Sequence, residues 1–322
     1  MLIAPPSLQA QQATPFPYVP GTDLSTLKGK ISADGSSTVF PIMEALAEEF
    51  NAEAGKVNMT LDVSGTGGGF KRFCKDEIDI ANASRAMKPE EVAACLANGV
   101  SYYVFEIAYD GISIVINPDN DWVDCLTTAQ LRQIWEPDSG VRKWSDINPA
   151  WPNKTITLYG PGTDSGTYDF FTKAINGEEG VSRDDYNPSE DDNVLVQGVA
   201  GDKGAMAFFG YSFYEENADS LKLLGIDSGS GCVQPSTQTV QDGTYSPLSR
   251  PLYLYVTAKA MTLPEVQEFM RFAIPEVGLL ISDVGFIGSP GQIYVEDQIR
   301  IEQIIAGQGT PDGPGTNATP GA

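Results

Sequence analysis

The chain has 322 residues, of which 41% are hydrophobic and 20% charged, as in a globular protein with one large domain or two of ordinary size. Its 43 acidic residues outnumber its 20 lysines and arginines and give a net charge of −23, which excludes nucleic acid and anionic lipid as partners. The chain has no histidine, and its apolar runs are too short to span a bilayer.

The two ends of the chain differ in composition from its middle. Residues 1–29 are rich in proline and glutamine, and residues 307–322 form a low-complexity tail. Such segments bury too little apolar surface to fold, so we expect both to stay out of the core. The first is expected to be part linker and part remnant of a secretory signal, and the second to be disordered. The folded body is expected between residues 30 and 306.

Strand-like and helix-like segments alternate through this body. Runs rich in β-branched and aromatic residues predict strands at residues 31–33, 60–64, 78–81, 111–117, 156–159 and 252–256. Apolar residues recur at helical spacing from Met43 to Phe50, and the same spacing starts again near Phe70 and near Tyr168. This alternation predicts an α/β fold with mixed, mostly parallel sheets flanked by helices, in which ligands bind beyond the carboxyl ends of the strands.

Three turns rich in glycine, serine and threonine each join an expected strand to an expected helix. They are residues 34–38 (DGSST), 64–69 (SGTGGG) and 160–167 (GPGTDSGT). The first N–H groups of a helix have no partner within the helix, and the helix dipole favours negative charge there, so each turn offers a site for a small oxyanion. Because the first and third turns lie far apart in the sequence, they meet around one ion only if two lobes face each other.

Each turn also has an ordinary interpretation, because serine and threonine are common N-caps. The second turn lacks the Gly-Lys-Ser/Thr ending of a nucleotide-binding P-loop. The third turn resembles a nucleophile elbow, but a Ser-His-Asp triad is excluded in a chain without histidine. The acidic runs at 119–121 and 190–192 lack EF-hand spacing and are expected to be solvated loops. We therefore expect no enzyme, no metal ion and no cofactor.

Arg85 is the cation that the sequence places best for binding such an ion. It follows the expected strand at 78–81 and lies between two of the turns. A guanidinium can hold an oxyanion through two parallel hydrogen bonds, which favours a ligand-binding role. The alternative is an ordinary surface ion pair, which the excess of acids favours.

The four cysteines are Cys74, Cys95, Cys125 and Cys232, and none forms a C-x-x-C pair. Four cysteines permit three pairings. Proximity in the sequence favours Cys74–Cys95, which leaves Cys125–Cys232, and two such disulfides imply an oxidising compartment. Four buried free thiols are the alternative.

Six blocks of sequence, specific as a set in this order, carry a family resemblance. They are GSSTVFP (35–41), SGTGGGFKRFC (64–74), DIANASR (79–85), NPDNDW (117–122), LRQIWEP (131–137) and TDSGTYDFF (163–171). Together they resemble the phosphate-binding proteins of bacterial phosphate ABC importers, the PstS family, and in particular its cyanobacterial-type branch. The resemblance extends from about residue 31 to residue 305.

The resemblance implies a two-lobed periplasmic-binding-protein fold of type II, with the ligand cleft between the lobes. One lobe would consist of residues 30–112 and 254–306, and the other of residues 113–253. The strand crossings near 111–116 and 251–256 would carry the hinge.

The resemblance also implies a ligand set. The binding residues would be Ser37, Thr38, Val39 (through its N–H), Thr66, Ser84, Arg85, Asp164, Ser165, Gly166 and Thr167. The longer enterobacterial-type members carry aspartate where Arg85 stands and arginine where Pro161 stands, so we infer that the guanidinium has changed lobes. Asp164 is the candidate acceptor for a phosphate proton, a role that would exclude sulfate; alternatively it orients Arg85 or caps its helix.

The function that this resemblance implies is high-affinity binding of inorganic phosphate by hinge closure, outside the cytoplasm, in the periplasm or as a secreted protein. The ion would be delivered to the membrane permease of an ABC importer, and we expect a monomer. The alternatives are a binding protein for another tetrahedral oxyanion (sulfate, arsenate or molybdate), a phosphatase on the same scaffold, and a surface protein that scavenges or senses phosphate without a permease.

Overall fold

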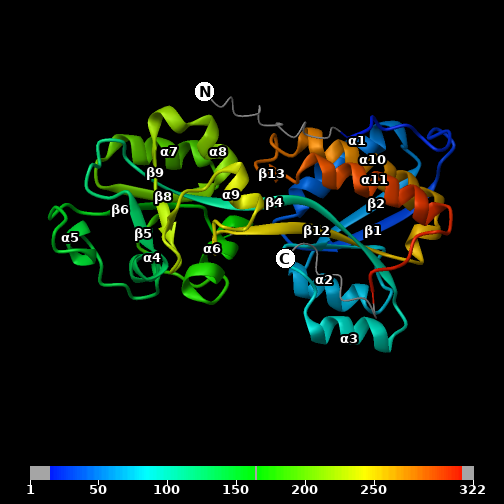
Figure 1. Ribbon diagram of the computed structural model, residues 1–322, viewed down its shortest axis with the longest axis horizontal. Helices are drawn as coiled ribbons and strands as arrows, with labels where there is room; N and C mark the ends of the chain where they lie inside the picture. The colour runs from blue at the N-terminus through cyan, green and yellow to red at the C-terminus, as the bar shows by residue number, and fades with distance from the viewer. Residues whose placement is uncertain (1–14, 164, 314–322) are drawn as a thin grey trace, which may run out of the picture.

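The computed structural model describes residues 15–163 and 165–313, which form two lobes connected by the strands β4 and β12 (Figure 1). The strands are β1 (Gly29–Gly35), β2 (Val57–Val63), β3 (Ile80–Ala83), β4 (Tyr102–Ile116), β5 (Cys125–Thr127), β6 (Thr157–Gly160), β7 (Asn187–Pro188), β8 (Ala205–Gly210), β9 (Lys222–Leu223), β10 (Gly225–Asp227), β11 (Cys232–Val233), β12 (Ser249–Thr257) and β13 (Ile287–Gly288). The helices are α1 (Phe40–Glu53), α2 (Gly65–Phe73), α3 (Pro89–Ala97), α4 (Thr128–Trp135), α5 (Trp144–Ile147), α6 (Gly166–Asn176), α7 (Asp192–Gly201), α8 (Tyr211–Glu216), α9 (Thr237–Gln241), α10 (Pro264–Leu280) and α11 (Gly291–Ile305).

Each lobe is built on one part of a mixed sheet. The strand order is β2-β1-β3-β12-β4 in the first lobe and β4-β8-β6-β7 in the second, where a smaller sheet, β11-β10-β5, is added. β1 is parallel to β2 and β3, and β6 is parallel to β7 and β8. The predicted mixed α/β fold is confirmed. The sheets are less parallel than predicted, because β4 and β12 run antiparallel to their neighbours.

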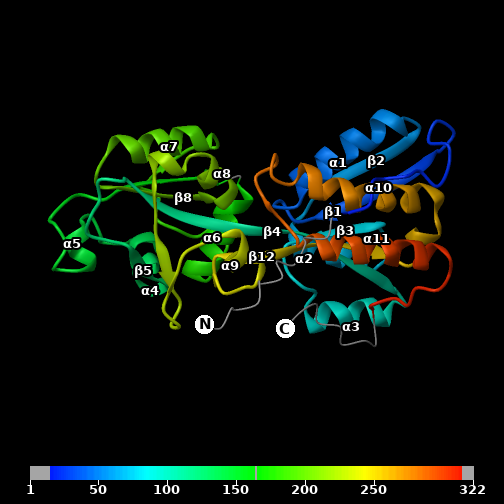
Figure 2. The same ribbon diagram turned by 45° about the horizontal axis from the view of Figure 1, so that its top comes forward.

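The long strand β4 belongs to both lobes. Its residues 102–111 pair with β12, and its residues 112–116 pair with β8. The return of the chain along β12 therefore places two neighbouring strands at the junction of the lobes, as Figure 2 shows. Every residue of β4 and of β12 is buried or half-buried, which anchors these two strands in the cores of both lobes.

Helices cover both faces of the first lobe's sheet: α1, α10 and α11 lie on one face and α2 and α3 on the other (Figure 1). On the first face, the rings of Phe50 and Phe269 meet edge to face with centroids 5.4 Å apart. On the second face, Phe70 meets Tyr255 of β12 in the same way at 4.9 Å. Edge-to-face pairs add to the stabilisation that area burial alone provides.

The predicted helical spacing from Met43 to Phe50 is confirmed in α1. Met43, Leu46 and Phe50 are fully buried, and Pro41 lies in the first turn, where its missing N–H costs nothing. In the second lobe, Trp135 contacts the rings of Phe171 and Phe208. This packing holds α6 against the sheet and positions the third turn at its N-terminus.

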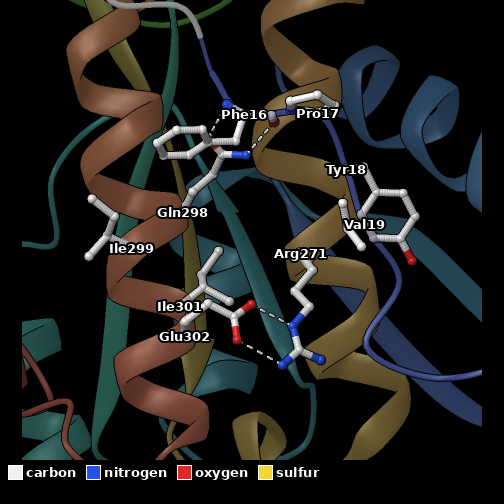
Figure 3. A pocket seen from close by; sticks show the side chains of 9 residues that line it. All are labelled: Phe16, Pro17, Tyr18, Val19, Arg271, Gln298, Ile299, Ile301 and Glu302. Carbon is white, nitrogen blue, oxygen red and sulfur yellow. Dashed lines mark hydrogen bonds and ion pairs between the residues drawn. The ribbon is translucent and has the colours of Figure 1, made fainter.

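The expectation that residues 1–29 stay out of the core is wrong for Leu24 and Leu27, which are buried in the first lobe's core. Burial of these two apolar side chains is favourable even though the segment around them is polar. Farther upstream, the segment lies over α10 and α11 (Figure 3). There the Phe16 backbone N–H donates to Gln298, and the Gln298 amide donates to the Phe16 carbonyl.

The expectation of a disordered tail is wrong for residues 307–313. The N–H groups of Gln308 and Gly309 donate to the Gln303 carbonyl, and the Asp312 N–H donates to the Tyr102 carbonyl at the start of β4. Backbone hydrogen bonds therefore place this segment despite its composition. Residues 314–322 lie outside the described residues.

Two disulfides crosslink the molecule, one in each lobe. Cys74 bonds Cys95 and Cys125 bonds Cys232, with Cα–Cα distances of 4.2 and 6.1 Å. The predicted pairing is confirmed, and the alternative of four free thiols is excluded. Within the described residues, no helix combines the length and the apolar character that crossing a membrane requires.

Candidate anion-binding site

The three predicted turns all lie at strand-to-helix junctions, β1 to α1, β2 to α2 and β6 to α6. A cavity of about 620 Å³ lies between the lobes at these junctions. Of the predicted site residues, it is lined by Ser37, Thr38, Thr66, Ser84, Arg85 and Gly166. The structure thus brings the first two turns, the segment after β3 and the start of α6 to one place.

The helices α1 and α2 both begin without a side-chain cap. Val39 occupies the N-cap of α1 and has no side chain that can accept a hydrogen bond. Ser64 occupies the N-cap of α2, but its hydroxyl donates to the buried carboxylate of Asp34 instead. By contrast, Thr127 caps α4 by accepting from the Gln130 N–H. The first-turn N–H groups of α2 are therefore left for an anion, whereas in α1 the Phe40 N–H donates to the Ser36 carbonyl and Pro41 has no N–H.

The glycines of the second turn have different roles. A Cβ on Gly69 would lie 2.7 Å from the Gly35 Cα, so this glycine lets α2 pack directly against the end of β1. A Cβ on Gly68 would meet the Ser64 hydroxyl at 2.5 Å. Gly67 lines the cavity, and an added Cβ there would make only ordinary van der Waals contact, 3.6 Å from the Arg85 Nη2. Close backbone approach to a ligand is therefore expected at Gly67 rather than at all three.

Arg85 lines the cavity, but its charge is already paired. Its guanidinium donates to both carboxylate oxygens of Glu91, at 2.7 and 2.8 Å, and a third of its side chain is exposed. The ion pair that the sequence left as an alternative is thus present. Burial alone would raise the pKa of Glu91, but the bonds from Arg85 and the Lys88 N–H bring it below its ordinary value. The same hydrogen bond raises the pKa of Arg85.

A second guanidinium, which the sequence reasoning missed, lies deeper in the cleft. Arg250 of β12 pairs with Asp110 of β4, with 3.0 Å between Nη2 and Oδ2, and only 19% and 3% of the two side chains are exposed. Arg250 also donates to the hydroxyls of Thr38 and Ser84, at 2.8 and 3.3 Å. Its Cζ lies 3.8 Å from the ring centroid of Phe170, in α6 of the other lobe.

Arg250 therefore contacts both connecting strands and both lobes. Burial lowers the pKa of its guanidinium, and Asp110 opposes that shift. An arginine nevertheless stays charged in a protein, so it provides a fixed positive charge at the bottom of the cavity. The available signal was the presence of two opposite charges, Asp110 and Arg250, in strands whose other residues are, apart from Glu106, uncharged.

The cavity is richer in cations than the chain as a whole. Besides the two arginines it is lined by Lys88 and Lys173, against the carboxylates of Asp169 and Glu179. Burial raises the pKa of the Asp169 carboxyl, Glu179 adds to the rise, and Arg250 opposes it. In a chain of net charge −23, this concentration of cations at two uncapped helix ends favours an anionic ligand.

The lobes touch at Gly166 and Thr38. An ideal Cβ on Gly166 would lie 2.7 Å from the Thr38 Oγ1 and 3.1 Å from the Thr38 backbone N, so a larger residue would require Thr38 to shift away from α6. Ser165 and Thr167 line a neighbouring cavity of about 410 Å³, on which Ser37 and Thr38 also border. In this arrangement Ser165 caps α6, because its hydroxyl accepts from the Thr167 N–H.

The remaining predicted site residues divide into three cases. The hydroxyls of Thr66 and Ser84 lie 3.1 Å apart and form one polar surface of the first lobe. The side chain of Val39 is fully buried, so only its backbone can face a ligand. Asp164 lies outside the described residues, and its assigned role stays a prediction.

Other sites are less suitable for an anion. A third cavity, of about 260 Å³, lies between the N-terminal segment and the helices α10 and α11 (Figure 3). It is lined largely by apolar side chains, and its one cation, Arg271, already pairs with Glu268 and Glu302. No group of three or more acidic or sulfur side chains suited to a metal ion occurs within residues 15–163 and 165–313.

Two lobes joined by two strands, with an anion site in the cleft between them, define a solute-binding protein of the type II periplasmic class. Residues 20–276 match the model of the PBP superfamily domain. The chain is 46% identical to protein SphX of Synechococcus elongatus over 278 residues, 85% of this chain and 82% of that protein. It is 41% identical to the phosphate-binding protein PstS of Staphylococcus saprophyticus over 281 residues, 86% of each.

Solved structures agree with these sequence matches. A possible phosphate binding protein from Planctomyces limnophilus superposes with a TM-score of 0.84 at 44% identity, covering 87% of this chain and all of that one. The chain belongs to the PBP superfamily and, within it, to the family of PstS and SphX proteins.

Proposed function

We propose that the protein binds inorganic phosphate in the cleft between its lobes and delivers it to the membrane permease of an ABC importer. Relatives that share more than a third of its sequence are named phosphate-binding proteins. The observation that carries the proposal is the guanidinium of Arg250, held beside two uncapped helix N-termini in a strongly acidic chain. Such a site attracts a small anion locally, where the negative net charge is screened.

In this proposal, each lobe provides its own donors. The first provides the hydroxyls of Ser37, Thr38, Thr66 and Ser84 and the N–H of Val39; the second provides Ser165, the N–H of Gly166, and Thr167. Arg250 provides the charge, because it already donates to two of these hydroxyls. Arg85 contributes a second guanidinium at the edge of the cavity if the ligand competes with Glu91 for it.

Binding and closure are coupled in the proposed mechanism. The lobes, residues 30–112 with 254–306 and residues 113–253, would open and close about β4 and β12. A ligand that contacts both lobes binds the closed arrangement better and shifts the population toward it. The contact between Gly166 and Thr38 supports this idea, since it gives the two lobes a point of direct approach.

We infer that the protein is not an enzyme and acts as a monomer outside the cytoplasm. The staphylococcal relative is named a phosphate-binding protein, and the chain has no histidine to activate a serine. The two disulfides suit an oxidising compartment.

Isothermal titration calorimetry of the full chain tests the proposal. Phosphate should bind one to one, whereas sulfate and molybdate at the same concentrations should produce no heat. Arsenate, which has the same shape and protonation, should compete with phosphate. Absence of phosphate binding, or a preference for sulfate, would refute the assignment. Release of p-nitrophenol from its phosphate ester would instead support the phosphatase alternative.

A further inference from the structure

The second turn enters α2 through two successive backbone conformations of opposite hand. Ser64 lies near the right-handed region, with φ −119° and ψ 11°, whereas Gly65 has φ +74°, a left-handed value that favours glycine. Such a pair directs neighbouring backbone N–H groups into one concavity, which binds anions. The N–H groups of Gly65, Thr66 and Gly67 donate to no oxygen among the described residues, and all three residues line the cleft cavity. The turn therefore offers these donors to a ligand, as long as no side chain of the protein takes them.

Ser64 is the side chain that would ordinarily take them. A serine at the start of a helix accepts from the N–H group two or three positions ahead, here that of Thr66 or Gly67. Its hydroxyl is close to the first turn of α2, since a Cβ on Gly68 would lie 2.5 Å from it. The hydroxyl nevertheless makes no capping bond and donates to Asp34 at 2.8 Å. Asp34 thus holds a competitor of the anion away from the donors.

The carboxylate of Asp34, at the end of β1, is fully buried. Its Oδ2 accepts from the Ser64 hydroxyl and, at 2.6 Å, from the guanidinium of Arg72, whereas its buried Oδ1 accepts from no described group. Arg72 is 39% exposed and also pairs with Asp62. Burial of a carboxylate costs more free energy than such an ion pair contributes, so stability alone does not account for Asp34.

We propose that Asp34 is a positioning residue, which keeps the N-terminus of α2 open for the anion by holding the Ser64 hydroxyl. Arg72, in the last turn of α2, fixes the carboxylate in place. Asp34 itself does not line the cavity, so its effect on the ligand passes through Ser64. This inference rests on the proposed function and goes beyond it by naming a residue that determines which donors of the first lobe are free.

The test measures Asp34→Ala in the presence and in the absence of Ser64→Ala. With Ser64 present, calorimetry should show phosphate affinity falling about 3- to 30-fold, the equivalent of one capping hydrogen bond. With Ser64→Ala, the same change should alter the affinity by less than about twofold, because no hydroxyl remains to cap the helix. The matched control is Asp62→Ala, which removes the other carboxylate bound to Arg72 and should leave the affinity unchanged.

Amide hydrogen exchange, followed by NMR without phosphate, tests the capping directly. The exchange of the Gly67 N–H should slow in Asp34→Ala and return to the wild-type rate when Ser64→Ala is added. If the wild type binds no phosphate, the proposed function fails, while this exchange still decides the role of Asp34. An unchanged exchange rate would overturn that role.

Two further results in calorimetry would also overturn it. One is an unchanged or higher phosphate affinity of Asp34→Ala, since the loss of a nearby negative charge by itself strengthens anion binding. The other is an equal loss of affinity with and without Ser64→Ala, which a general distortion of the site would produce. If thermal unfolding shows that Asp34→Ala is not folded, Asp34→Val takes its place, because valine has a similar volume and suits a strand.

Discussion

Two arginines line the cleft, and we expect their removal to weaken phosphate binding to different extents. Removing Arg250 alone would leave the buried carboxylate of Asp110 unpaired and destabilise the fold by about 3–5 kcal/mol. The better variant is Arg250→Met with Asp110→Asn, which removes both charges and keeps similar volumes. The matched control is Arg85→Met, because Arg85 is a third exposed and already paired with Glu91.

The expected magnitudes follow from burial. Loss of a buried, hydrogen-bonded charge partner typically costs about 2–5 kcal/mol, so the double variant should bind phosphate roughly 30- to 5,000-fold more weakly. A partly exposed pair is worth at most about 1 kcal/mol, so Arg85→Met should weaken binding by less than about fivefold. Calorimetry measures both, and thermal unfolding shows whether each variant is folded. If Arg85→Met lost more phosphate affinity than the double variant, this reasoning would be refuted, and Arg85 would be the cation that binds the anion.

Three further predictions concern closure and stability. Gly166→Ala should weaken phosphate binding in calorimetry, because the new Cβ would lie 3.1 Å from the Thr38 backbone N and would hinder closure. In X-ray scattering, the radius of gyration of this variant should stay at its ligand-free value when phosphate is added. An unchanged affinity would contradict the proposed contact. Burial raises the pKa of Asp297 from 3.8 to about 7, so its ionisation in the folded state costs up to roughly 4 kcal/mol above that pH and nothing below pH 3.8. Asp297→Asn should therefore stabilise the protein against urea more at pH 8 than at pH 5, and an equal effect at both values would contradict the assignment. Replacing both cysteines of the Cys125–Cys232 disulfide, which lie 107 positions apart, with alanine should lower the free energy of unfolding by about 2–5 kcal/mol. An unchanged urea midpoint would show that packing alone holds this loop.

The sequence by itself was sufficient for the local features of the site. The turn residues of 34–38, 64–69 and 160–167 are each followed by helical apolar spacing, so their places at strand-to-helix junctions were predictable. The pairing of Cys74 with Cys95 was also favoured by proximity, and it left Cys125 for Cys232. The turns and the Cys74–Cys95 pair depend on residues close together in the chain, where spacing carries the information, whereas the second pair, 107 positions apart, followed only by elimination.

The tertiary structure alone decided which charges line the cleft. Arg250 and Asp110 are 140 positions apart, and only the antiparallel pairing of β12 with β4 brings them together. The burial of Leu24 and Leu27 likewise depends on a core formed from the far end of the chain. The sequence favours Arg85 because its neighbours in the chain are polar, yet α3 supplies Glu91 to pair with it. Charge pairing depends on distance in space and on desolvation, and neither quantity can be read from composition or local spacing.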